Sequence, residues 1–141
     1  MRFAPVLAAA LLFTACGSRT ESPQTVPTVE EASVRFVRPL PGDTVSNPVA
    51  LVMEVRGLTL LPAGEMVEGA GHLHVLVDTL FVEAGTVIPK NDNHLHYGDA
   101  RTEAEVTLEP GEHVLRLQFG DGAHVALAGP QYRDEIRIVV R

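Results

Sequence analysis

Four of the six histidines in this 141-residue sequence fall into two His-x-His motifs, one from His72 to His74 and one from His94 to His96. Side chains on a β-strand alternate between its two faces, so each motif places both imidazoles on one face. Neutral imidazoles are good ligands for divalent copper, zinc and nickel. The motifs therefore predict a metal site, and its candidate ligands are His72, His74, His94, His96 and, further along the chain, His124.

Three further side chains have chemistry of their own. Met66 offers a soft thioether that suits Cu(I). Asp121 is either a ligand or an acceptor for the second nitrogen of a ligating imidazole. His113 opens a predicted strand, and we expect it to lie at the opposite end of the domain and to have a structural role.

Metal binding without catalysis is the favoured hypothesis. The histidines also fit two other functions. The first is a hydrogen-bonded polar cluster, or a pH-sensitive surface, in a module that binds an envelope protein or a glycan without metal. The second is a metalloenzyme, which requires an open coordination position on the metal. The sequence has neither a nucleophile elbow nor a phosphate-binding glycine motif, and this leans against catalysis.

The elements that must position these residues are short strands. Apolar and polar residues alternate with period two over residues 34–37, 49–55, 72–77, 103–108, 113–119 and 135–140, with weaker signals at 80–82 and 86–88. No segment shows a sustained helical period, and 57–71 is expected to be a long loop. The sequence therefore predicts an all-β fold, an immunoglobulin-like antiparallel β-sandwich of about seven strands.

The predicted topology brings the two motifs together. In the immunoglobulin strand order, the loop before residue 72, the segment before residue 103 and the loop after residue 119 share one end of the sandwich. His94 and His96 are expected in the second of these connections. All five candidate ligands then gather at that end, whereas His113 lies at the other.

The first sixteen residues indicate export. Arg2 and an apolar run over residues 4–13 have the form of a signal peptide, and the run is shorter than the ~20 residues that span a bilayer. The following segment, Phe13-Thr14-Ala15-Cys16, resembles a bacterial lipobox, and Cys16 is the sole cysteine of the chain. We expect a signal peptide over 1–15, a lipidated Cys16 with a flexible linker over 16–32, and a β-sandwich domain over 33–141.

The net charge and the predicted export limit the molecules that this protein is expected to bind. Eleven basic and eighteen acidic residues give a net charge of −7 without a basic stripe, which argues against nucleic acid. The lipid anchor predicts a cell-envelope lipoprotein held to the membrane on its extracytoplasmic face. Copper or zinc is the expected ion, and an envelope protein or a glycan is the partner if the histidines bind no metal.

Several short motifs together resemble the bacterial domain of unknown function 4399 family. The segment 71–78 has its Gly-His-x-His-hydrophobic-Asp signature, and the resemblance extends over residues 34–140. Tyr97 replaces the usual Phe, and residues 126–129 replace a proline-rich stretch. The resemblance implies a secreted or envelope-bound domain and supplies no function. The other matching segments are 41–43, 62–64, 94–98, 101–103, 110–113, 117–121 and His124.

Overall fold

The structure is a computed structural model, and it describes residues 30–141. The predicted signal peptide, Cys16 and most of the predicted linker lie outside the described residues. Over the described part of the chain, no helix is long and apolar enough to cross a membrane. The strands are β1 (Ser33–Arg38), β2 (Thr44–Val45), β3 (Val49–Arg56), β4 (Thr59–Leu60), β5 (Ala70–Val77), β6 (His94–Tyr97), β7 (Glu103–Val106), β8 (Gly111–Gly120) and β9 (Arg133–Val140), with a 3₁₀ turn, η1 (Pro130–Tyr132), before β9.

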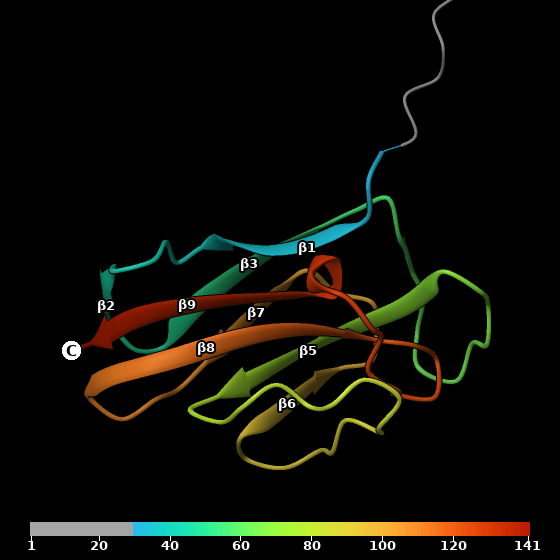
Figure 1. Cartoon of the computed structure of the whole chain (residues 1–141). Helices are drawn as coiled ribbons and strands as arrows, with labels where there is room; N and C mark the ends of the chain where they lie inside the picture. Colours follow the sequence, from blue (N-terminus) through green and yellow to red (C-terminus); the bar gives the residue numbers. More distant parts are fainter. Residues whose placement is uncertain (1–29) are drawn as a thin grey trace, which may run out of the picture.

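The strands form two sheets, and this confirms the predicted all-β sandwich (Figure 1). One sheet has three strands in the order β1-β3-β7. The other has six, in the order β2-β9-β8-β5-β4, with β6 paired to β5. The long strands pair antiparallel, whereas β2 runs parallel to β9 and β4 runs parallel to β5. This order of strands is the immunoglobulin-like order that the sequence predicts.

The core lies between the sheets, and it follows the period-two pattern of the sequence. Successive side chains of a strand point to opposite faces, so alternate residues of each long strand face the other sheet. On β5 these inward residues are Leu73, Val75 and Val77. They pack against Val34, Phe36, Val49, Leu51, Met53, Val106, Leu115, Leu117, Phe119, Ile136, Ile138 and Val140.

Strand β5 is buried along its whole length, including the face that points away from the core. The connection from β5 to β6, residues 78–93, covers this outer face. The side-chain amide of Gln118 accepts the Val82 N–H at 3.0 Å and donates to the Val82 carbonyl at 2.8 Å. Arg116 donates to the Thr79 carbonyl. Residues His72 and His74, which share the face of Gln118, are therefore enclosed although they point outward.

Three local predictions were wrong. Residues 94–97 form a strand that pairs with β5, rather than an irregular segment before β7. Residues 80–82 and 86–88 form no strand, and of these residues only Val87 makes a bridge, to Val125. The connection 78–93, which contains them, is instead held by polar side chains of β8 and by the loop after β8. The expected loop 57–71 contains the short strand β4 and the start of β5.

His113 lies at the opposite end of β8 from the His-x-His motifs, as predicted. His72 is paired with Gly120, seven residues further along this strand, which corresponds to about 23 Å. The Nδ1 atom of His113 contacts an Asp78 carboxylate oxygen at 2.7 Å, and its Nε2 contacts the Glu109 carbonyl at 2.7 Å. Asp78 also accepts the Val114 N–H at 2.8 Å. Both residues thus join β5 to β8 and have a structural role.

The contribution of His113 to stability is expected to depend on pH. Burial lowers the pKa of His113, but the bonds to Glu109 and Asp78 outweigh burial, and the net pKa is raised. The charged form therefore stabilises the fold fully below the unfolded value of about 6.5, and this stability is lost as pH rises through the folded pKa. We expect His113→Asn to lower the free energy of unfolding more at pH 5.5 than at pH 8.5, measured by urea titration. An equal loss at both pH values would contradict a charged His113.

Candidate metal centre

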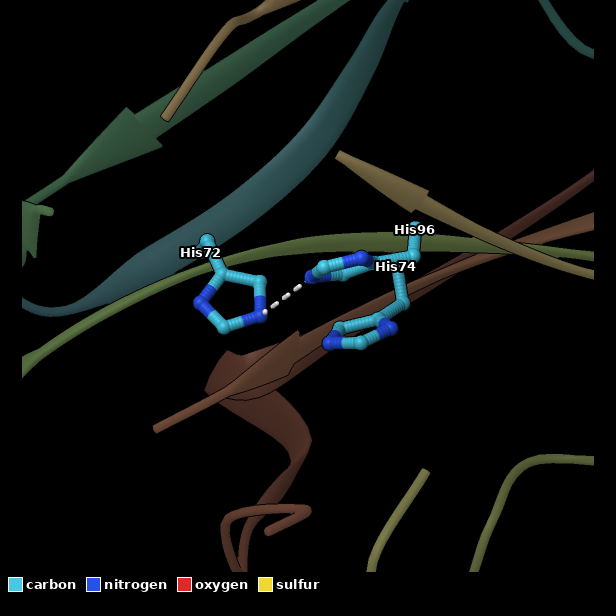
Figure 2. A group of neighbouring side chains, drawn as sticks. All are labelled: His72, His74 and His96. Carbon is cyan, nitrogen blue, oxygen red and sulfur yellow. Dashed lines mark hydrogen bonds between the residues drawn. The ribbon is translucent and has the colours of Figure 1, made fainter. Parts of the chain in front are cut away.

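Four imidazoles meet on the outer face of the six-stranded sheet. His72 and His74 come from β5, His96 comes from β6, and His124 follows β8. Every pair of these rings has its centroids between 4.6 and 5.8 Å apart. Figure 2 shows the rings of His72, His74 and His96 turned toward one another. We call these four residues the histidine cluster.

The nitrogens of the cluster have the spacing of ligands around one ion. The Nε2 atom of His96 lies 3.1 Å from Nε2 of His72 and 3.1 Å from Nε2 of His124. His72, His74 and His96 each offer a nitrogen, and these three atoms all lie within 4.8 Å of one another. With zinc–nitrogen bonds of 2.0–2.1 Å, two ligands of a tetrahedral ion lie about 3.4 Å apart. The nitrogens of His72, His74 and His96 could therefore hold one transition-metal ion after some adjustment.

Three nitrogen atoms of the cluster are buried without a hydrogen-bond partner among residues 30–141. They are Nδ1 of His72 and both ring nitrogens of His74, and both side chains are 0% exposed. A buried polar group without a partner costs about 1–3 kcal/mol, and native proteins contain few of them. A bound metal ion would satisfy one nitrogen of His74, so the buried atoms favour a metal at this point.

The pKa values of His72, His74 and His96 are lowered, which favours the neutral form that binds metal. Burial, together with the neighbouring histidines, lowers the pKa of His72 to about 4 and that of His74 to about 3. Burial also lowers the pKa of His96, with a further effect of His124. At neutral pH these imidazoles carry free lone pairs. A set of nitrogen donors suits zinc and copper rather than magnesium or calcium, which prefer oxygen.

The pairing of β5 with β6 sets the position of the ligands. In this ladder His74 is directly opposite His96, and His94 is opposite Leu76. On the other side of β5, His72 is opposite Gly120. A Cβ atom at Gly120 would lie 3.0 Å from Nε2 of His74, so the absence of a side chain there leaves room for the His74 ring.

Gly98 has the same role beside His96. A Cβ atom at Gly98 would lie 2.4 Å from Nε2 of His96 and 3.2 Å from the Cβ of Ala63. Real Cβ atoms do not approach a ring this closely, so any side chain would displace the imidazole. Sequence reasoning missed Gly98 and Gly120 as site residues, although Gly98 lies only two residues after the second His-x-His motif.

Two backbone hydrogen bonds from the loop 62–64 join the segments that carry His96 and His124. The Ala63 N–H donates to the Gly98 carbonyl at 2.9 Å, and the Gly64 N–H donates to the Gly122 carbonyl at 2.8 Å. Residues 62–64, one of the segments that resemble the family, therefore bond to two parts of the site. The sequence contains no signal for these long-range bonds.

The structure brings together four of the five predicted ligands, and His94 lies apart from them. Its Nδ1 contacts Asn91 Oδ1 at 2.9 Å, and it lies two residue pairs along the ladder from His96. Asp121 accepts backbone N–H groups rather than an imidazole. Met66 is 68% exposed, with its sulfur beside Gly122. The cluster lies on the covered outer face of the sheet, rather than in the end loops as expected.

The comparisons with known proteins give a family and nothing finer. A family model described as "Domain of unknown function (DUF4399)" matches residues 51–141, which include the whole histidine cluster. Neither the curated proteins nor the solved structures gave a match.

Proposed function

We propose that this chain, which belongs to the DUF4399 family, is an envelope lipoprotein whose β-sandwich binds one ion of copper or zinc without catalysing a reaction. His72, His74 and His96 are its ligands. One observation carries the proposal. Three imidazole nitrogens lie within 4.8 Å of one another, and among the described residues both nitrogens of buried His74 lack a partner.

The absence of catalysis rests on the shape of the site. A catalytic metal keeps an open coordination position that a substrate can reach. Two of the three ligands are 0% exposed, and the connection 78–93 covers their face of the sheet. His124 also contacts these ligands, with its Nε2 3.1 Å from that of His96. A buried ion with imidazoles on several sides suits storage, buffering or a structural role.

Metal titration of the full-length protein tests the proposed function. We expect one equivalent of zinc or copper to bind, measured by calorimetry and by metal content after desalting. His113→Asn is the control, because both nitrogens of His113 are occupied far from the cluster. Binding no tighter than that of a surface histidine would refute the metal function. It would favour the alternative, a module that binds an envelope protein or glycan and uses its histidines structurally.

The envelope location is a separate part of the proposal, and it rests on residues 13–16. Diacylglyceryl transfer to a cysteine thiol requires Cys16, the only thiol in the chain. We expect cells fed an alkyne-tagged fatty acid to label the wild-type protein and to leave Cys16→Ser unlabelled. The wild-type protein should also fractionate with membranes. Equal labelling of both proteins would contradict lipidation at Cys16, with no consequence for the metal site.

A further inference from the structure

Two loop segments, joined by backbone hydrogen bonds and one isolated β-bridge, link the histidine cluster to the surface. They consist of residues 85–88 and 124–126, and together we call them the cover ribbon. The Gly85 N–H donates to the Ala126 carbonyl, and the Ala126 N–H donates to the Thr86 carbonyl, both at 2.9 Å. The Ile88 N–H donates to the His124 carbonyl at 2.8 Å. Val87 and Val125 form the antiparallel bridge between them.

His124 is the ribbon residue that enters the cluster. Its φ of 67° lies in the left-handed region, which residues other than glycine rarely adopt. Asp121 holds this conformation, because its Oδ1 accepts the N–H groups of Ala123 and Val125 at 2.8 and 2.9 Å. Its carbonyl also accepts the His124 N–H at 2.9 Å. Asp121 is therefore the positioning residue for the His124 ring.

Without metal, the side chain of His124 has a weak hold on the cluster. Its Nε2 and that of His72 both contact Nε2 of His96. A ring nitrogen carries either one proton or one lone pair. His96 therefore bonds one neighbour well or shares a single lone pair between two. A metal ion would use one lone pair from each ring and remove this competition.

We propose that His124 is a further ligand of the metal, and that through it metal occupancy locks the cover ribbon onto the domain. This regulation rests on the proposed metal function. Ligand binding to the closed state lowers the population of locally open states by mass action. The metal-bound and metal-free forms then differ at the surface, because the cover ribbon opens less often when metal is bound.

The connection 78–93 also contains an amide, that of Val82, that serves as an internal reference for hydrogen exchange. The Val82 N–H is bonded to the side chain of Gln118 at 3.0 Å, and Arg116 and Arg133 both lie over the ring of Phe81. None of these contacts involves the histidine cluster. The first half of the connection 78–93 is therefore expected to be insensitive to metal, whereas the Ile88 amide should respond.

Hydrogen–deuterium exchange of the full-length protein, with and without zinc, tests this regulation. We expect zinc to slow exchange of the Ile88 amide by about tenfold or more and to leave the Val82 amide unchanged. His124→Asn keeps a residue suited to positive φ. In this variant zinc should still bind through the other ligands, with lower affinity than in the wild type, and should not protect the Ile88 amide. Asp121→Asn, which keeps the Oδ1 acceptor, should respond like the wild type, and Asp121→Ala should respond less.

Each result decides between distinct conclusions. Zinc binding without a change at Ile88 would overturn the coupling and leave the metal function intact. Protection of Ile88 that persists in His124→Asn would show that His124 does not carry it. Equal protection of Ile88 and Val82 would indicate a general stabilisation and would also overturn the coupling. Failure of zinc to bind at all would overturn the metal function together with this inference.

Discussion

Replacing His96 by alanine is expected to lower the affinity for zinc or copper about a thousandfold, the largest effect of any single change discussed here. The Nε2 atom of His96 is 3.1 Å from Nε2 of two other histidines, so its ring is central to the cluster. Loss of an indirect partner of a metal ligand costs about 10–100-fold in affinity, and loss of a ligand should cost more. Competition with a chelator of known affinity measures the change.

His94→Ala is the matched control for His96→Ala. His94 lies on the same strand and face, two residues away, and its Nδ1 contacts Asn91. We expect its loss to leave the affinity for metal unchanged, and circular dichroism should show that both variants keep the β fold. His96 is only partly buried, which makes a folded alanine variant a reasonable expectation. Equal losses of affinity in the two variants would mean that the metal is not bound by the histidine cluster.

Gly98→Ala is expected to lower the affinity for metal by about 10–100-fold without removing a ligand. The added methyl group would lie 2.4 Å from Nε2 of His96, with Ala63 behind it at 3.2 Å. The backbone at Gly98 does not have a positive φ, so alanine causes no conformational strain there. The ring of His96 must therefore rotate away, and its lone pair no longer points to the other ligands.

A double-mutant cycle separates this mechanism from a general loss of stability. If Gly98 acts only through His96, the variant with both Gly98→Ala and His96→Ala should bind metal as His96→Ala does. Additive losses would show that Gly98→Ala disturbs the site by another route. The measurement is again chelator competition, with thermal unfolding of all three variants as the check on folding.

Much of the fold could be predicted from the sequence because the direction of a side chain on a strand is a local property. Period two in 49–55 and 72–77 assigned Leu51, Met53, Leu73 and Val75 to the core and placed His72 and His74 on the other face. The turn residues between the strands, and the immunoglobulin order, then placed His113 far from the motifs. Strand β6 was missed because four residues, two of them histidine, carry little hydrophobic signal.

The histidine cluster could be predicted only in part. Its residue types and the shared face of each motif follow from the sequence, as does the approach of His124 after β8. The position of His94 beside Asn91, two residue pairs along the ladder from His96, depends on the register of β6 against β5. Register is set by pairing between residues about twenty positions apart, and a local pattern does not contain it.

The sequence by itself determined that this chain forms a β-sandwich and presents pairs of imidazoles on strand faces. Only the tertiary structure decided that His74 and His96 face each other, that Gly98 leaves room for a ring, and that the outer face of β5 is buried. Burial of that face comes from the bonds of Gln118 to Val82, which join distant segments. The physical reason is range: alternation is local, whereas pairing, close approach and enclosure depend on contacts between residues far apart in the chain.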